Sequence, residues 1–258
     1  VDDLTFTLIN EGTEYAVTDS VKSATGSLTI PDTYEGKPVT EIGAEAFFES
    51  QLTAIELPAG LRSIGEDAFG STLIESIDLP ATLTRIDSLA FNFSKLKSIS
   101  LPAGLTFIGK FAFAYCGSLT GSVTIPSGIT VIPDSLFYST DLTEVIFHDA
   151  VTSIERYSFD GTHLTSLRLP ASLTTLGDGA FRYTYNLAEV RFEGAAPSLG
   201  VDVFSDAGSS VAGGTQFYIY DTYESSYQNS AGWSGFTFAV LENPNAPMLE
   251  AFVLTTSL

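Results

Sequence analysis

Leu-Pro-Ala-Gly-Leu-Arg-Ser-Ile-Gly-Glu-Asp-Ala-Phe, residues 57–69, is one copy of a pattern that runs through most of this 258-residue chain. Its final phenylalanine belongs to a row that recurs every 22 to 24 residues: Phe47, Phe69, Phe91, Phe113, Phe137, Phe159, Phe181 and Phe204. A near-constant period of this length is typical of a solenoid, in which each unit buries its apolar face only against its neighbours. The sequence therefore predicts eight stacked units that share one continuous core.

Each unit carries further apolar positions at fixed distances before its phenylalanine. In the unit quoted above these are Ile55 and Leu57, two residues apart, and Ile64, five residues before Phe69. The alternation at Ile55 and Leu57 is the period-two pattern of a short strand with one face turned inward. Pro58 cannot donate to a continuing strand ladder, so the strand ends there. Stacked units of this kind predict a parallel sheet on one face and short turn or 3₁₀ corners on the other.

The pattern of residues 57–69 resembles the repeat of the BspA-like leucine-rich-repeat proteins, which are surface proteins of host-associated bacteria. The first unit, residues 30–47, has the longer opening loop of that family, and residues 217–220 and 233–236 are similar to its closing segment. The resemblance covers residues 27–206 and implies an α/β repeat fold, a right-handed leucine-rich-repeat solenoid capped at both ends. It also implies binding to host extracellular matrix proteins or to other bacteria.

Four segments are expected along the chain. Residues 1–26 predict a β-hairpin cap, because Asn10-Glu11-Gly12 separates two runs of strand-forming residues. Residues 27–206 hold the eight repeats, and residues 207–240 predict a second cap that protects the other open sheet edge. Residues 241–258 are linker-like and end in an apolar run, which either begins a further domain or packs back as a strand.

The composition excludes two classes of partner. The chain has 31 acidic and 11 basic residues and a formal net charge of −20, which repels nucleic-acid phosphates and anionic membrane surfaces. No run of 18 apolar residues predicts a membrane-spanning helix. We expect a monomer that is secreted or held at the cell surface, with its signal peptide removed or outside this chain.

No set of residues predicts catalysis, a cofactor or a metal. Cys116 occupies a position where the other units have Ser or Thr, and is interpreted as a small buried residue. Gly104–Lys110 fits most of a phosphate-binding loop, but Phe111 follows where Ser or Thr is needed. His148 and His163 lie on different edges of their units and are interpreted as ordinary exposed side chains. We therefore expect no enzyme activity, no cofactor and no metal site.

The remaining candidates form two rows of outward-facing side chains. One row follows the exposed face of the sheet, where strands lie about 4.8 Å apart, and runs from acidic through small hydroxyl to basic side chains. The other row lies at the corners and is aromatic. The candidate interaction surface comprises Glu56, Asp78, Ser100, Thr124, Glu144, Ile146, His148, Arg168, Glu189, Arg191, Tyr138, Tyr183 and Tyr185.

Two interpretations of this surface stay open: ordinary solvated repeat surface, or a recognition surface. Because Tyr and Arg dominate the energetics of interfaces, recognition predicts an extended protein ligand. We expect a non-enzymatic protein-interaction or adhesion module that binds host matrix or other surface proteins. The alternatives are a glycan-binding module, in which exposed Tyr and Trp233 stack on sugar rings, and a passive scaffold or spacer that presents a neighbouring domain.

Overall fold

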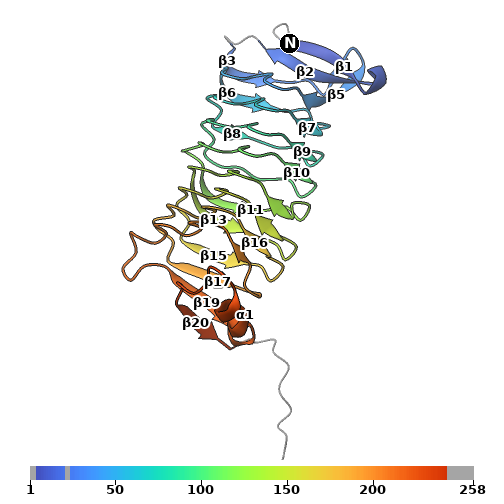
Figure 1. Ribbon diagram of the computed structural model, residues 1–258. Coiled ribbons are helices and arrows are strands. Elements are labelled where there is room, and N and C mark those ends of the chain that lie inside the picture. The colour runs from blue at the N-terminus through green and yellow to red at the C-terminus, as the bar shows by residue number, and fades with distance from the viewer. Residues whose placement is uncertain (1–3, 21–23, 243–258) are drawn as a thin grey trace, which may run out of the picture.

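The computed structural model describes residues 4–20 and 24–242. The units stack into an elongated solenoid, with the N-terminal units, blue in Figure 1, and the C-terminal units, red, at opposite ends. Each unit has three sides: a strand of a main sheet, a shorter strand of a second sheet, and a turn that carries the row phenylalanine. The predicted fold class is confirmed, since the chain is a solenoid of parallel strands with little helix.

The main sheet is formed by the strand that precedes each proline turn. Its strands pair in parallel in three groups. Side chains alternate along them, so that Leu167 and Leu169 are buried while Arg168 between them is exposed, because one face packs on the core. The three groups are β3 (Thr25–Thr29), β6 (Gln51–Glu56) and β8 (Ser76–Ile77); β11 (Thr120–Thr124) and β13 (Asp141–Ile146); and β15 (Ser166–Leu169), β17 (Glu189–Phe192), β19 (Gln216–Tyr220) and β20 (Phe238–Leu241).

A second parallel sheet surrounds the isoleucine row, where the sequence predicted only turns or 3₁₀ corners. Most of its strands have two residues, too few to produce a periodic pattern. The sheet is interrupted at Pro133, which lacks the N–H that Gly109 donates at the equivalent position one unit earlier. The strands before the interruption are β2 (Glu14–Ser20), β5 (Lys37–Ile42), β7 (Ser63–Ile64), β9 (Arg85–Ile86) and β10 (Phe107–Ile108). Those after it are β12 (Val131–Ile132), β14 (Ser153–Ile154), β16 (Thr175–Leu176) and β18 (Ser198–Leu199).

The third side of each unit is a turn and not a 3₁₀ helix. Among the described residues, 3₁₀ helix occurs only in η1 (Asn10–Gly12) and η2 (Asp221–Tyr223). In every turn the residues two before and two after the row phenylalanine have a positive φ. We call these positions the left-handed slots: Glu45, Glu49, Asp67, Ser71, Leu89, Phe93, Phe111, Tyr115, Ser135, Ser139, Tyr157, Gly161, Gly179, Tyr183, Asp202 and Asp206.

Backbone hydrogen bonds between units hold the left-handed slots in place. In the first seven units, the N–H groups of both slots and of the row phenylalanine donate to carbonyls of the next unit. Phe111, for example, donates to Asp134 O at 3.1 Å and Phe113 to Leu136 O at 3.1 Å. A left-handed conformation costs a residue with a Cβ about 1–2 kcal/mol. These repeated bonds keep that conformation even at bulky residues.

The row phenylalanines form one column through the core. Neighbouring ring centroids are 5.2 to 5.7 Å apart and the rings are nearly parallel. The first seven rings are fully buried, whereas Phe204 at the C-terminal end is half-buried. Burial of a phenylalanine side chain contributes about 1.5–3 kcal/mol, and each aromatic pair adds about 0.5–1.5 kcal/mol. The column is therefore a main source of stability.

The two ends of the solenoid differ in structure. At the N-terminal end, β1 (Leu4–Ile9) and β2 form an antiparallel hairpin, and β2 also pairs in parallel with β5. β4 (Thr33–Tyr34) pairs with β5 as well. At the C-terminal end, β19 and β20 extend the main sheet, and α1 (Glu224–Asn229) lies between them in the chain. The predicted linker at 241–258 lies outside the described residues beyond Glu242.

Candidate functional site

The first row of candidates lies on the exposed face of the main sheet. Strand register places Thr124 beside Ile146 and Arg168 beside Arg191. The row continues onto Tyr218, which pairs with Arg191 and which the sequence did not indicate. Its exposed members are Glu56, Asp78, Ser100, Thr124, Ile146 and Arg168, and Arg191 is half-buried.

Acidic neighbours neutralise the basic end of this row. Arg168 Nε donates to Glu193 Oε1 at 2.8 Å, and Arg191 Nη2 donates to Glu189 Oε1 at 3.1 Å. The Arg191 guanidinium also lies 5.9 Å from the ring centroid of Tyr218. Exposed ion pairs of this kind contribute little to stability, but they cancel each other's field. The sheet face therefore offers a ligand less free positive charge than its arginines suggest.

Two other candidates lie beside this row. Glu144 is exposed in the neighbouring row, where it pairs with Ser122. His148 is half-buried, so its interpretation as an exposed side chain was wrong. Its Nε2 lies 3.0 Å from Ile129 O, and its Nδ1 accepts the N–H of Ala150 at 3.2 Å. The imidazole joins two turns because it offers both a donor and an acceptor where most units have proline.

The corner carries a continuous aromatic surface that is larger than the sequence predicted. Phe93 and Tyr115 stack with ring centroids 4.3 Å apart, and Tyr115 meets Tyr138 edge-on at 5.0 Å. Tyr183 lies 5.9 Å from Tyr185. We call this surface the corner aromatic patch: Phe93, Phe111, Tyr115, Tyr138, Tyr157, Tyr183, Tyr185, Arg156 and Arg182.

Two arginines connect the rings of the patch. The guanidinium carbon of Arg182 lies 4.8 Å from the ring centroid of Tyr157 and 4.9 Å from that of Tyr183. Arg156 lies 5.3 Å from the Tyr157 ring. Cation–π contacts of this geometry contribute about 0.5–2 kcal/mol each. A hollow of 320 Å³ lies between these arginines and the rings of Phe111, Tyr115, Tyr138 and Tyr157.

A buried carboxylate fixes the position of Arg182. Asp160 is almost fully buried, and its Oδ2 accepts a hydrogen bond from Arg182 Nε at 2.9 Å and forms an ion pair with Arg182 Nη2 at 2.7 Å. Burial raises the pKa of the Asp160 carboxyl above its ordinary value, although Arg182 opposes that shift. Because both guanidinium nitrogens are held, the cation stays over the tyrosine rings instead of sampling solvent.

Five members of the patch occupy left-handed slots: Phe93, Phe111, Tyr115, Tyr157 and Tyr183. Glycine fills the companion slot in two of these units, Gly161 with Tyr157 and Gly179 with Tyr183, and glycine adopts a positive φ without steric cost. Aromatic side chains are therefore tolerated here at an energetic cost. The sequence interpretation missed Phe111, Tyr157, Arg156 and Arg182. The spacing of two residues before each row phenylalanine would have identified Phe111 and Tyr157.

The exposure of the predicted tyrosines is only partly as expected. Phe93 is 51% exposed, Tyr183 39% and Tyr185 44%. Tyr138 is half-buried, so its prediction as an exposed residue was wrong. Burial, followed by the nearby Asp160 carboxylate, raises the pKa of its phenol. The edge-on contact with Tyr115 covers part of the ring, which a one-dimensional pattern does not reveal.

The interpretation of Cys116 as a small buried residue is confirmed. Its side chain is fully buried in a row with Ser and Thr, and its Sγ donates to Phe91 O at 3.0 Å. Thr140 and Thr162 in the same row donate to the carbonyls of their row phenylalanines. Burial raises the pKa of the Cys116 thiol to about 11, so the reactive thiolate is scarce at neutral pH.

Trp233 is not available to a sugar ring, and the stacking role considered for it was wrong. Its side chain is 1% exposed, and its Nε1 donates to Pro197 O at 2.9 Å. Its indole meets Phe192 edge-on at 5.1 Å. The residue therefore closes the core at the C-terminal end.

The described part of the chain has no site with the geometry of a metal centre. Among these residues no group of three His, Cys, Asp or Glu side chains is placed to hold a metal ion. Residues 4–20 and 24–242 also include no helix of the length and apolarity that crossing a membrane requires.

Comparisons with known proteins agree with this architecture. A family model described as BspA type leucine rich repeat region, with six copies, matches residues 22–139 and 120–216, which together cover more than half of the chain. No curated protein sequence matches.

Three solved structures match this chain. A leucine rich cell surface protein from Faecalibacterium prausnitzii is 23% identical, with a TM-score of 0.55, over 86% of this chain and 70% of that one. A leucine-rich repeat protein from Bacteroides ovatus is 21% identical, with a TM-score of 0.49, over 93% and 76%. The leucine rich repeat protein of T. pallidum is 22% identical, with a TM-score of 0.41, over 94% and 98%. The first of these shows a shared fold and, at this identity, nothing more.

Proposed function

We propose that this chain, which belongs to the BspA-type leucine-rich-repeat family, is a protein-interaction module. Its main contact surface is proposed to be the corner aromatic patch. The proposed role is adhesion at a bacterial cell surface or after secretion, with host matrix proteins or surface proteins of other bacteria as ligands. The similar F. prausnitzii structure is called a cell surface protein, which supports this location. The module is proposed to act by binding alone, without catalysis.

The observation that carries this proposal is the placement of aromatic residues in left-handed slots. Each such residue costs stability that glycine would not, yet Tyr115 and Tyr183 remain 41% and 39% exposed to solvent. Tyr and Arg are also the residue types that concentrate binding energy in protein interfaces. A patch of rigid rings and two positioned guanidinium groups therefore supports recognition better than it supports an ordinary solvated surface.

A protein ligand fits the patch better than a glycan does. Arg182 occupies the space above the Tyr157 and Tyr183 rings, so those faces are not free to stack on a sugar. The sheet-face row, with its paired charges, is proposed as a secondary contact that sets orientation. A passive spacer would need neither feature.

The test removes the aromatic rings without harming the fold. In Tyr115→Gly combined with Tyr183→Gly, we expect binding to immobilised matrix proteins and bacterial surface extracts to fall about tenfold, measured by surface plasmon resonance. The melting temperature should stay nearly constant. Glycine removes the energetic cost of the left-handed conformation at both positions, and this gain offsets the lost ring contacts.

Ser71→Gly is the matched control, because Ser71 also occupies a left-handed slot but lies outside the patch. It should leave binding unchanged. Unchanged binding in the tyrosine double variant would reject the patch as the contact surface. Strong signals on a glycan array, together with no protein ligand, would replace this proposal with glycan binding.

A further inference from the structure

The three hydrogen-bond chains of the corners end at the C-terminal face of the solenoid. In the seventh unit, the N–H groups of Gly179, Phe181 and Tyr183 still donate to Val201, Val203 and Ser205 of the last unit. The equivalent N–H groups of the last unit belong to Asp202, Phe204 and Asp206. None of the described residues accepts a hydrogen bond from these three N–H groups. The last corner therefore presents a row of three unused donors.

The direction of these chains makes the row electropositive. At the slots and the row phenylalanines, every backbone bond between units runs from the N–H of one unit to the carbonyl of the next, so these peptide dipoles add along the solenoid. Asp202 and Asp206 have positive φ values of 57° and 59°, with ordinary residues between them. The equivalent N–H groups of the preceding unit, at Gly179, Phe181 and Tyr183, all point toward the next unit, so the three N–H groups of the last unit point together away from the stack.

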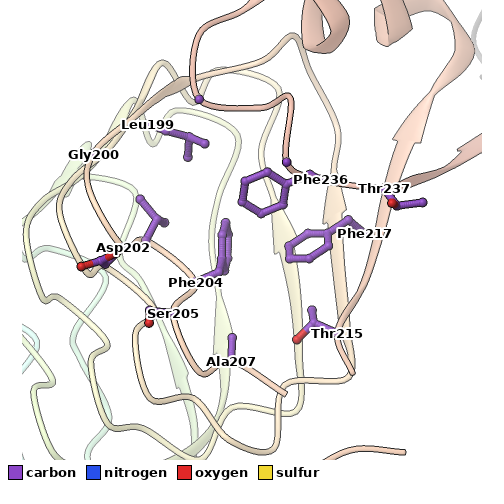
Figure 2. A pocket seen from close by; sticks show the side chains of 13 residues that line it. Leu199, Gly200, Asp202, Phe204, Ser205, Ala207, Thr215, Phe217, Phe236 and Thr237 are labelled. Carbon is purple, nitrogen blue, oxygen red and sulfur yellow. The ribbon is translucent and has the colours of Figure 1, made fainter. Parts of the chain in front are cut away.

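A cavity of 630 Å³ lies beside this row (Figure 2). Phe204, the last ring of the core column, has no parallel ring on its outer side. Phe217 and Phe236 meet it edge-on instead, with centroids 5.2 and 6.0 Å away. Figure 2 shows these three rings turned toward one another. Although β19 and β20 continue the main sheet, the cavity lies where the corner of a ninth unit would continue the phenylalanine column, and Leu199 contributes to its apolar lining.

The charge around the cavity decides which oxygen atoms it accepts. Asp202 is the one ionisable side chain among the described residues of its wall, and Asp206 occupies the next left-handed slot. Two carboxylates this close to the N–H row disfavour a phosphate or a free carboxylate. Neutral carbonyl oxygens accept from these N–H groups without that repulsion. A cation next to them is attracted by the two carboxylates.

A second copy of the chain is a poor occupant. Glu45 and Glu49 fill the left-handed slots of the first unit. End-to-end stacking would bring these side chains against Asp202 and Asp206, and like charges in contact oppose association. The acidic slots at both ends therefore work against polymerisation of the solenoid.

We infer that the C-terminal face is a second binding site, which takes a peptide segment of a partner protein as a substitute for a ninth unit. The carbonyl oxygens of the segment accept from Asp202, Phe204 and Asp206, an aromatic side chain packs against Phe204, and a lysine or arginine pairs with Asp202. This site is separate from the corner aromatic patch, so either can fail without the other.

The experiment uses the full chain and a labelled peptide, acetyl-Lys-Thr-Phe-Thr-Lys-amide. Binding is measured by fluorescence anisotropy, and amide shifts by NMR. We expect saturable binding with downfield shifts of the Asp202, Phe204 and Asp206 amide protons. Shifts confined to the corner aromatic patch, or equal binding of acetyl-Glu-Thr-Phe-Thr-Glu-amide, would overturn the inference. Equal shifts with acetate would also overturn it, because the site would then bind simple anions.

Two variants sharpen the test. Gly235 lines the cavity, and no described atom lies within 4 Å of the position of a Cβ there, so Gly235→Phe should fold and weaken peptide binding about tenfold. Gly117→Phe is the matched control, since Gly117 has the same free space but lies far from the cavity in the chain. Asp202→Asn keeps a residue that tolerates the left-handed conformation and should weaken binding about threefold.

The variant results separate this inference from the proposed function. Wild-type affinity in Gly235→Phe would reject the cavity as the site. Tyr115→Gly combined with Tyr183→Gly should leave binding of this peptide unchanged, whereas it should weaken binding at the corner aromatic patch about tenfold. Loss of peptide binding in the tyrosine variant would show that the peptide binds the patch instead.

Discussion

The core column and the left-handed slots lie only two residues apart in the sequence, yet the residue type is constant in the column and changes from unit to unit in the slots. The column holds phenylalanine in all eight units, and seven of the rings are fully buried. The slots hold acidic side chains at the two ends, as in Glu45 and Asp206, and aromatic side chains in the middle, as in Tyr115. The backbone hydrogen bonds are the same in both regions.

This difference shows that the stability of the stack and the chemistry of its surface depend on different positions of the repeat. Every column position faces the same environment, namely the ring before it and the ring after it, so one residue type suits all units. Most slot side chains reach the surface, although that of Ser135 is buried, and the backbone bonds hold the slot conformation with many different side chains. Residue choice at the slots is therefore free to vary along the solenoid and to form a binding surface.

The largest expected effect comes from the column. Phe113→Ala should lower the free energy of unfolding by about 3–5 kcal/mol, because it leaves a cavity between two rings that the solenoid cannot close. Urea denaturation followed by circular dichroism measures this loss. Phe113→Leu should recover part of it. A loss below about 1 kcal/mol in the alanine variant would mean that the column is not the main source of stability.

An intermediate effect is expected where the patch contacts the interior. Arg182→Met should lower the free energy of unfolding at pH 7 by about 2 kcal/mol, because it leaves the buried Asp160 carboxylate unpaired. The value lies below that of a fully buried pair, since the Arg182 side chain is 26% exposed. Matched urea titrations of the variant and the parent protein test this.

The loss in Arg182→Met should depend on pH with a definite sign. Burial raises the pKa of the Asp160 carboxyl, so the folded protein binds this proton more readily than the unfolded chain does. A carboxyl whose pKa is higher in the folded than in the unfolded state stabilises the protein at low pH. This contribution is lost as the pH rises through the folded-state pKa. The loss of unfolding free energy in Arg182→Met, relative to the parent protein, should therefore become smaller as the pH is lowered from 7 to about 4. Asp160→Asn added to Arg182→Met should remove the dependence, and a deficit that grows on acidification would contradict this assignment.

The smallest effect is expected on the sheet face. Arg168→Glu combined with Arg191→Glu should change the free energy of unfolding by less than about 1 kcal/mol, because both ion pairs are exposed. Binding of an acidic partner segment should weaken about twofold at low salt, and less at high salt. A tenfold loss would reverse the comparison, because it would make the sheet face the primary contact surface in place of the corner aromatic patch.

Much of the fold followed from the sequence, while the candidate site followed only in part. The phenylalanine row and the alternation along each strand predicted the stack, and the buried position of Cys116 followed from the same repeat. The second sheet did not, because two-residue strands such as β14 form only when adjacent units align their backbones. Arg182 escaped notice for a similar reason, since its partner Asp160 is 22 residues away in the neighbouring unit.

The sequence by itself determined the solenoid fold, the inward phenylalanine row and the family, because each follows from a period that can be counted along one dimension. The tertiary structure alone decided which side chains the stack leaves exposed. It covered Tyr138 and Trp233 and set Arg182 above two tyrosine rings. It also left the N–H groups of Asp202, Phe204 and Asp206 without an acceptor among the described residues. These outcomes depend on contacts between units, and such contacts exist only once neighbouring turns of the chain lie side by side.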